Sequence, residues 1–289
     1  MEVKLKDCTI KKAVIMCGGW ATRFLPVSKA TPKELLPLYD TPILQILVND
    51  LIKNGVNQIM FVIRNGKESI AKYFSRDISY ENAVGEKEYI LNKITNYNLA
   101  HFFFTYQNFQ RGTGDALLQT KEWVGKDTFF LLNGDEVINH QPSLVEQMLS
   151  KYQSVKSSVM GLYKVSDIDV KKYGIVEIQN KENGLIKGIV EKPDIFNAPS
   201  NFANIGTYIF KSNIFDYIHM SLDMPITDAI NLYTKDNLFY GLEIHGERYD
   251  LGSPLGYVLS NLNYILHRDD TKKEATKYIE SLGFEYINK

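Results

Sequence analysis

The chain has 289 residues, of which 44% are hydrophobic and 23% are charged, proportions that exclude a disordered, collagen-like or coiled-coil protein. Its 33 lysines and arginines are balanced by 34 aspartates and glutamates, so a net charge of -1 excludes the strongly basic surface of a non-specific nucleic-acid binder. We therefore expect no nucleic-acid partner, and any phosphate must be bound by a local group of cations.

Cysteines and apolar runs indicate the cellular compartment. The two cysteines, Cys8 and Cys17, cannot build a disulfide framework, and the five histidines lack the short pair spacing of a zinc site. No stretch approaches about 20 apolar residues, so neither a signal peptide nor a transmembrane helix is predicted. We expect a cytoplasmic protein without a membrane partner.

Strands and helices alternate in the first half of the chain. The expected strands are 13–17, 59–63, 101–106 and 129–132, and the expected helices are 42–54, 68–74 and 114–123. Gly55 stands where a C-cap would end the first helix, and the aromatic run 101–109 is expected in the core. The alternation predicts βαβ units around a mostly parallel sheet, with ligands beyond the carboxyl ends of its strands.

The second half is expected to be antiparallel or mixed. Expected strands are 158–165, 174–179, 185–190 and 205–210, with 180–184 as a turn, and expected helices are 253–267 and 272–282. No linker rich in proline, glycine or serine separates the halves, and no repeat recurs. The sequence therefore predicts a single domain over residues 1–289.

The richest motif follows the first expected strand. The heptapeptide CGGWATR comes directly after the strand, and two lysines follow it. Gly18 and Gly19 have no Cβ, so their main-chain N–H groups can approach a phosphate. Arg23, Lys29 and Lys33 supply positive charge. The alternative is a plain βα turn with solvated charges, because the motif is neither a phosphate-binding loop nor the dinucleotide fingerprint.

This motif opens a long ordered series. MCGGWATRFLPVSKATPKELLPLYDTPILQ is followed by GTGDA, LLNGDEVI, DVKKYGIVEI, VEKP, PSNFANIGTYIF, TDAI and RYDLGSPLGY, in that order. The series spans about residues 10–260 and resembles the sugar-1-phosphate nucleotidyltransferases, among them the bacterial uridylyltransferases. Such an ordered series is far more specific than any one of its members.

The resemblance implies both a fold and a reaction. The fold would be α/β, a Rossmann-like mixed, mostly parallel sheet flanked by helices. Its nucleotide-binding half would span about 10–140, its sugar-binding half about 141–260, and its C-terminal helices about 253–289. A sugar-1-phosphate oxygen would attack the α-phosphorus of a nucleoside triphosphate and expel pyrophosphate. The implied substrates are UTP and glucose 1-phosphate, and the implied assembly is a homo-oligomer with the C-terminal helices at its interface.

The resemblance also assigns the residues of the nucleotide site. Arg23 and Lys33 would hold the triphosphate and favour departure of pyrophosphate, and Gln107 would read the pyrimidine edge. The implied nucleotide-binding set is Cys17, Gly18, Gly19, Arg23, Lys33, Gln107 and Gly112.

A metal site and a sugar site are implied as well. Asp135 and Asp250 would hold Mg²⁺, whose preferred ligands are carboxylate and phosphate oxygens. Glu191 would accept hydrogen bonds from sugar hydroxyls, and Lys192 would bind the sugar phosphate. The implied sugar-phosphate set is Gly174, Glu191, Lys192 and Asn204, and the implied catalytic set is Arg23, Lys33, Asp135 and Lys192.

Some positions depart from the family's pattern and keep alternatives open. Ala21 replaces the last glycine of the first motif, and the usual Gly-Glu-Ile-Gln run is absent from 222–226. The other departures are Trp20, Asn108, Asp115 and Ser253-Pro254. The same reaction with dTTP, CTP or another sugar phosphate, and a catalytically weak paralogue that binds nucleotide sugar, remain as alternatives. A nicotinamide dehydrogenase is disfavoured, because the glycine spacing is wrong.

Overall fold

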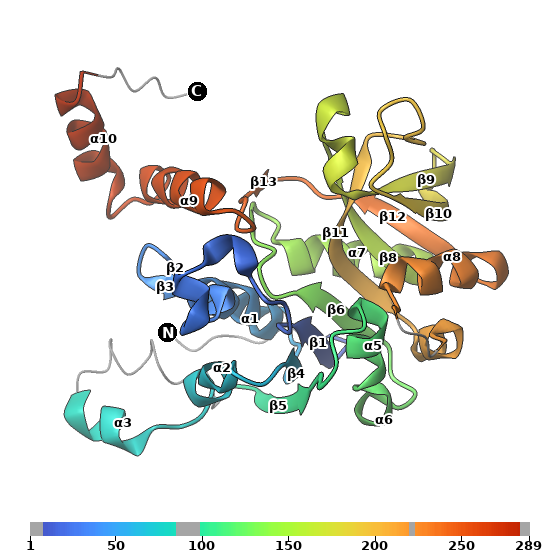
Figure 1. Ribbon diagram of the computed structural model, residues 1–289, viewed down its shortest axis with the longest axis horizontal. Helices are drawn as coiled ribbons and strands as arrows, with labels where there is room; N and C mark the ends of the chain where they lie inside the picture. Colours follow the sequence, from blue (N-terminus) through green and yellow to red (C-terminus); the bar gives the residue numbers. More distant parts are fainter. Residues whose placement is uncertain (1–7, 85–98, 220–222, 284–289) are drawn as a thin grey trace.

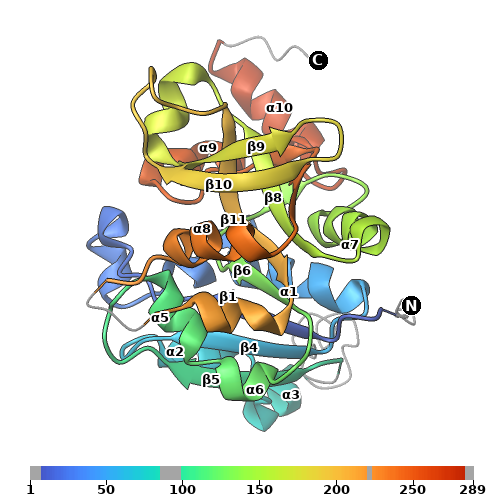
Figure 2. The ribbon, with the colours of Figure 1, turned by 90° about the vertical axis from the view of Figure 1, so that its right-hand side faces the viewer.

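A nine-stranded mixed sheet separates two layers of helices (Figures 1 and 2). The computed structural model describes residues 8–84, 99–219 and 223–283. In chain order the strands of this sheet are β1 (Lys12–Met16), β4 (Gln58–Ile63), β5 (His101–Tyr106), β6 (Phe129–Asn133), β8 (Ser158–Lys164), β9 (Gly174–Asn180), β10 (Leu185–Glu191), β11 (Phe202–Phe210) and β12 (Phe239–Glu243). Their spatial order is β5-β4-β1-β6-β11-β8-β12-β10-β9.

The two halves of the chain contribute differently to this sheet. Strands β5, β4, β1 and β6 are all parallel, with Ala13 of β1 opposite Ile59 on one side and Phe130 on the other. Beyond β6 the pairings are antiparallel, except that β12 runs parallel to β8. The expected parallel first half and mixed second half are thus confirmed. The carboxyl ends of the parallel strands meet at one edge, where the predicted ligand-binding residues follow them.

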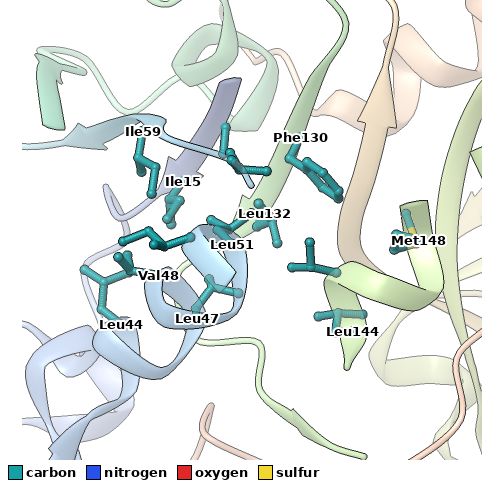
Figure 3. Packing of buried hydrophobic residues seen from close by; sticks show 14 of the residues in the cluster. Ile15, Leu44, Leu47, Val48, Leu51, Ile59, Phe130, Leu132, Leu144 and Met148 are labelled. Carbon is teal, nitrogen blue, oxygen red and sulfur yellow. The ribbon is translucent and has the colours of Figure 1, made fainter. Parts of the chain in front are cut away.

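Helices α1 (Ile43–Lys53), α2 (Glu68–Tyr73) and α7 (Leu144–Val155) cover one face of the sheet (Figure 3). Helix α1 buries Leu44, Leu47, Val48 and Leu51 against β1, β4 and β6, since the spacing of these residues places them on one side of a helix. Gly55, at φ 87°, ends α1 as expected. Each fully buried leucine of this kind contributes about 1.5–3 kcal/mol.

The opposite face is covered by α5 (Thr113–Leu118), α6 (Lys121–Val124), α8 (Ile226–Asp236) and the 3₁₀ helix η6 (Ser212–Tyr217). The single helix expected at 114–123 is therefore wrong, because the chain breaks between α5 and α6. Thr120 causes the break, since its hydroxyl donates to the carbonyl of Leu117 at 2.7 Å and ends the first helix.

The expected burial of the aromatic run is only half correct. Successive side chains of a strand point to opposite faces, and in the edge strand β5 they alternate between the core and solvent. Phe102 and Phe104 pack against Phe61, with ring centroids 6.0 and 5.3 Å apart. Phe103 is 37% exposed and Phe109, beyond the strand, is 69% exposed.

Short helices and strands connect the elements of the central sheet and its helical layers, and two longer helices end the described part of the chain. The short elements are η1 (Thr22–Phe24), η2 (Val27–Lys29), η3 (Lys33–Leu35), β2 (Pro37–Leu38), β3 (Thr41–Pro42), α3 (Ile78–Val84), β7 (Ile138–Asn139), η5 (Asp167–Lys172) and β13 (Glu247–Arg248). Helices α9 (Pro254–Leu266) and α10 (Lys272–Ser281) confirm the two expected C-terminal helices and project from the body of the molecule (Figure 1). Within the described ranges, no helix has the length and apolarity needed to cross a membrane.

Candidate active site

A cleft of about 390 Å³ opens at the carboxyl ends of β1, β5 and β6. Its wall includes six of the residues that the sequence assigned to nucleotide or metal: Gly18, Gly19, Lys33, Gln107, Gly112 and Asp135. A second hollow of similar volume lies between α1 and α7, and none of the predicted site residues lines it. The first cleft is therefore the candidate active site.

The glycine loop between β1 and η1 forms the floor of this cleft. The main-chain N–H of Cys17 donates to the carbonyl of Val62 at 2.8 Å, which continues the parallel pairing with β4. Cys17 is fully buried behind the loop, its N–H is bonded to Val62 and its carbonyl accepts from Lys67 Nζ, so the residue supports the loop and does not line the cleft. Burial raises the pKa of the Cys17 thiol well above its usual value, and the negative charge of Glu34 adds to this effect. The thiol therefore stays neutral.

Two of the unusual loop residues have clear environments. Ala21 lies in the left-handed region of backbone conformation, at φ 51° and ψ 40°, which glycine adopts with less steric strain than any other residue. Trp20 is exposed, and the guanidinium of Arg64 lies 4.0 Å from the centre of its ring. This cation–π contact holds the indole beside the end of β4.

A buried ion pair supports the loop from below. The ammonium of Lys67 donates to both carboxylate oxygens of Glu34, at 2.7 and 2.8 Å, and to the carbonyl of Cys17 at 2.6 Å. Both side chains of the pair are only 2% exposed. Burial raises the pKa of Glu34, and the charge of Lys67 opposes that shift. The sequence motif contains Glu34, but nothing in the sequence marks Lys67 as its partner.

Lys33 and Asp135 meet inside the cleft. The ammonium of Lys33 donates to Asp135 Oδ2 and forms an ion pair with it. Burial alone would lower the pKa of Lys33, but the attraction of Asp135 outweighs it and the pKa is raised. The cation assigned to the triphosphate and the carboxylate assigned to the metal are therefore adjacent.

Asp250 and Arg23 lie on neighbouring loops, although neither lines the cleft wall. Arg23 Nη1 is 3.5 Å from the carbonyl oxygen of Gly252. Asp250 accepts from the N–H of Gly252 at 3.1 Å and from the Ser253 hydroxyl at 2.7 Å. Ser253 also accepts from the N–H of Gly256 and caps α9, and Pro254 occupies the first turn. The unusual Ser-Pro pair thus has a structural role at the start of α9.

The sugar-side residues are brought together by the antiparallel pair of β9 and β10. Gly174 lies opposite Glu191 in the register, and a Cβ on Gly174 would come within 3.0 Å of Glu191 Oε2. Lys192 Nζ lies 3.3 Å from Glu191 Oε1, and both side chains are largely exposed. The carboxylate and the ammonium that the sequence assigned to sugar hydroxyls and sugar phosphate therefore stand side by side at the end of β10.

An irregularity in β11 links this group to the cleft. Asn204 accepts from the N–H of Gly206 at 2.9 Å and donates to the hydroxyl of Tyr208 at 2.7 Å. Gly206 adopts φ 70°, and a Cβ there would lie 1.9 Å from Asn133 Nδ2. Asn133 lines the cleft, so only glycine at 206 leaves room for its side chain.

A second buried ion pair lies directly after Asp135. Arg248 binds Glu136 in a bidentate manner, with Nε–Oε1 at 2.6 Å and Nη2–Oε2 at 3.0 Å, and also donates to the hydroxyl of Tyr173 at 3.2 Å. Burial raises the pKa of Glu136, and Arg248 counteracts part of that shift. The pair joins β13 to the segment that carries Asp135 and to the turn before Gly174. Sequence analysis did not find it.

The base side of the cleft is closed by the segment before α8. The carbonyl of Met224 accepts from the N–H of Gly114 at 2.6 Å, and the N–H of Met224 donates to the carbonyl of Arg111 at 2.7 Å. A Cβ on Gly112 or Gly114 would come within 2.6 or 2.7 Å of the Met224 oxygen. These contacts explain both glycines of the GTG motif. Residue 222 of the divergent run lies outside the described residues, but its continuation at Met224 contacts both glycines of the GTG motif.

Comparisons with known proteins agree with this geometry. The family model described as "Nucleotidyl transferase" matches residues 12–265. The sequence is similar to the UTP–glucose-1-phosphate uridylyltransferase 1 of Staphylococcus saprophyticus, with 34% identity over 95% of this chain and 99% of that protein. It is also 34% identical to the UTP–glucose-1-phosphate uridylyltransferase of Mycoplasma genitalium, over 93% of this chain and 97% of that protein.

Solved structures give the same result. A UDP-glucose pyrophosphorylase from Acinetobacter baumannii superposes with a TM-score of 0.87 and 31% identity, covering 94% of this chain and 99% of that one. A UDP-glucose pyrophosphorylase in complex with UDP-glucose superposes with a TM-score of 0.79 and 32% identity, covering 90% of this chain and all of the other. These likenesses confirm the expected fold class and the family resemblance of the motifs.

Proposed function

The chain belongs to the nucleotidyl transferase family, and from this premise we propose that it makes UDP-glucose and pyrophosphate from UTP and glucose 1-phosphate. The observation that carries the proposal is the cleft itself, where the glycine loop, the Lys33–Asp135 pair and Gln107 meet at one sheet edge. Relatives with this activity align over nearly the whole chain, and one of the similar solved structures contains bound UTP.

The reaction needs positioning more than covalent catalysis. A phosphate oxygen of glucose 1-phosphate forms a bond to the α-phosphorus of UTP, while the bond from that phosphorus to the bridging oxygen of the β-phosphate breaks. Pyrophosphate leaves with the electron pair. Because both reactants are anions, the protein must hold them in line and neutralise their charge.

On this proposal, each half of the chain binds one reactant. The main-chain N–H groups of the glycine loop, together with Arg23 and Lys33, bind the triphosphate and stabilise the leaving pyrophosphate. Lys192 binds the sugar phosphate, and Glu191 accepts hydrogen bonds from the sugar hydroxyls. Gly174 leaves room for the Glu191 carboxylate, and Asn204 is held in the sugar pocket by Tyr208.

A divalent cation, which we take to be Mg²⁺, completes the charge balance. Among the described residues, no group of three or more His, Cys, Asp or Glu side chains is arranged to hold a metal. Magnesium is commonly bound by one or two carboxylates together with substrate phosphates and water, so Asp135 and Asp250 fit it as a pair. When bound, the ion would neutralise phosphate charge and orient the triphosphate.

The decisive experiment measures pyrophosphate release over a matrix of nucleoside triphosphates and sugar 1-phosphates, with Mg²⁺ and with EDTA. We expect the strongest rate with UTP and glucose 1-phosphate, and no rate with EDTA. A strongest rate with dTTP or CTP would move the proposal to another nucleotide. Nucleotide binding without turnover for every pair would favour a binding protein that has lost catalysis.

A variant tests the metal assignment separately. Asp135→Asn keeps the size of the side chain but cannot balance the charge of Mg²⁺, so we expect kcat to fall by about 10²-fold or more while the melting temperature changes little. Melting curves and pyrophosphate release measure both quantities. Wild-type activity of Asp135→Asn over a range of Mg²⁺ concentrations would refute the assignment.

We also propose that the chain forms a homo-oligomer through α9. Leu255, Val258 and Leu259 follow a helical spacing on one side of α9, and all three side chains are more than half exposed. A second copy of the chain would cover them.

A further inference from the structure

The amide of Gln107 is held in one orientation inside the cleft. Gln107 follows β5, its main-chain N–H donates to the carbonyl of Ile63 at 2.8 Å, and its side chain is almost fully buried. The side-chain Nε2 donates to the carbonyl of Gly112 at 2.9 Å and to Asp115 Oδ2 at 3.0 Å. Both hydrogens of the amide nitrogen therefore have acceptors within the protein.

The amide oxygen is left to face the glycine loop. A Cβ added to Gly18 would come within 3.1 Å of Gln107 Oε1, so the oxygen lies against the floor of the cleft. The opposite orientation of the amide would place Oε1 against two acceptors, the Gly112 carbonyl and the Asp115 carboxylate. Such contacts are repulsive, so this network fixes which amide atom can meet a ligand.

Of the two acceptors that hold the Gln107 amide nitrogen, only Asp115 is a side chain and can therefore be changed by substitution. Its carboxyl is 2% exposed in the first turn of α5, and Arg111 Nη2 donates to its other oxygen, Oδ1, at 3.2 Å. Its two oxygens thus receive one hydrogen bond from the Gln107 amide and one from the Arg111 guanidinium, and a carboxylate oxygen can only accept. Asp115 can therefore only hold the nitrogen end of the Gln107 amide.

We propose that Asp115 is a positioning residue that turns the Gln107 amide oxygen toward the nucleobase and so selects bases with an imide N–H over cytosine. Uracil and thymine carry a hydrogen on N3 that can donate to this oxygen. Cytosine carries a lone pair on N3, and two acceptors facing each other lose the hydrogen bond. This inference rests on the proposed function, because it concerns the base of the same nucleotide substrate, and it leaves uracil and thymine equivalent.

The main test compares UTP with CTP in the wild-type protein and in Asp115→Asn. An asparagine can donate to Oε1 or accept from Nε2, so in this variant only the Gly112 carbonyl still opposes the turned-over amide. We expect the ratio of kcat/KM for UTP to that for CTP to fall by about tenfold or more, the change that corresponds to one misplaced buried hydrogen bond. The KM for glucose 1-phosphate should stay unchanged, which a merely structural defect would not achieve.

A matched control removes a half-buried carboxylate outside the cleft. Asp50 lies in α1 outside the cleft, where it accepts from the N–H of Val145 at 3.1 Å and from Asn54 Nδ2 at 2.9 Å. Asp50→Asn should lower the melting temperature but leave the UTP/CTP ratio at the wild-type value. If Asp115→Asn is too unstable to assay, Asp115→Ser replaces it, since a hydroxyl can also donate to or accept from the amide.

A double-mutant cycle tests whether Asp115 acts through Gln107. Gln107→Ala should lower the UTP/CTP ratio by itself, and adding Asp115→Asn to that variant should change the ratio no further. An equal loss of discrimination in the presence and absence of the Gln107 side chain would overturn the inference. So would an unchanged ratio in Asp115→Asn.

These experiments distinguish a failure of the inference about Asp115 from a failure of the proposed function. Calorimetric affinities for UTP and CTP give the same ratio without turnover, so an inactive preparation still tests the inference. A wild-type protein that binds and turns over none of the nucleotides would refute the proposed function. A wild-type protein that uses UTP, with a ratio that Asp115→Asn does not alter, would refute the role of Asp115 alone.

Discussion

Ala21 places a side chain where the backbone favours glycine. At φ 51° its Cβ crowds the neighbouring carbonyl, and the adjoining turn forms part of the phosphate-side loop. We expect Ala21→Gly to raise the free energy of unfolding by about 1 kcal/mol, because the crowding is removed.

Urea unfolding curves measure this gain, and a second alanine provides the control. Ala30, in the same loop region, has φ −118°, so Ala30→Gly should gain nothing and lose a few tenths to about 1 kcal/mol through chain entropy. A loss of stability in Ala21→Gly as large as that in Ala30→Gly would show that the left-handed conformation costs nothing here.

The buried pair of Glu34 and Lys67 supports the loop from below. Lys67→Met leaves Glu34 buried without its cation and removes the hydrogen bond to the Cys17 carbonyl. We expect a loss of about 3–5 kcal/mol in unfolding free energy, and a much smaller loss in the double variant Glu34→Leu/Lys67→Met, which leaves no unpaired charge.

Chemical denaturation of the single and double variants measures the difference. The exposed pair of Lys187 and Glu177, at 2.7 Å, provides the comparison, since Lys187→Met should cost less than about 1 kcal/mol. A loss in Lys67→Met no greater than that in Lys187→Met would contradict a structural role for the buried pair.

At this scale the sequence pointed to residues that line the cleft but not to the side chains that support them. The resemblance assigned Lys33 and Asp135, and the structure places them in contact in the cleft. Lys67 and Arg248 are not predicted from the sequence, because each contacts its partner only after strands far apart in the chain have paired. No local pattern marks a lysine or arginine that will become buried in this way.

Among the elements, α8 supports the strand that carries the sugar-side residues. Asn231 of α8 accepts from the N–H of Ile189 at 2.7 Å and donates to its carbonyl at 2.9 Å. These bonds replace a neighbouring strand at this point, since β10 pairs with β12 only at Leu185. The strand β10 then ends at Glu191, directly before Lys192.

Asn231→Ala should therefore loosen β10 at its functional end. Two buried main-chain groups lose their partners, so we expect a loss of about 2–3 kcal/mol in unfolding free energy and a raised KM for glucose 1-phosphate, with the KM for UTP unchanged. Thr234→Ala is the matched control, because it removes one exposed hydrogen bond from the same helix to β10. Equal effects on both KM values would mean that α8 supports the fold without positioning the sugar site.

The sequence predicts the helices and strands that have a clear hydrophobic pattern of their own. It does not predict those whose conformation depends on pairing with a segment far away in the chain. Helix α1 and strands β1 and β4 show clear periodicity or continuous apolar runs, and the structure confirms them. Strand β12 has only five residues, and it pairs in parallel with β8, which lies far from it in the sequence. Helix α7 does carry a local signal, since Ser143 accepts from the N–H of Glu146 in the manner of an N-cap, although no helix is among the expected elements there.

On the scale of the whole molecule, one continuous sheet joins the two halves of the site. The parallel half supplies the glycine loop and Asp135, and the antiparallel half supplies Glu191 and Lys192. Strand β11 pairs with both β6 and β9, so its irregular segment at Asn204 stands between the two groups. Two bound anions can be aligned in such a site without a hinge between separate domains.

The projecting C-terminal helices make a prediction about assembly. Leu255, Val258 and Leu259 are 70%, 60% and 54% exposed on α9, and a monomer would leave this apolar side in water. Leu259→Glu should place a charge in the proposed contact between two copies, so light scattering after size-exclusion chromatography should show a smaller species than the wild type, with an unchanged melting transition of the subunit fold. The control is Leu238→Glu, which changes an equally exposed leucine (57%) outside α9 and should leave the assembly intact. A wild-type protein that is monomeric, or a Leu259→Glu variant of unchanged size, would refute the interface, since apolar contact is the interaction that would hold such copies together.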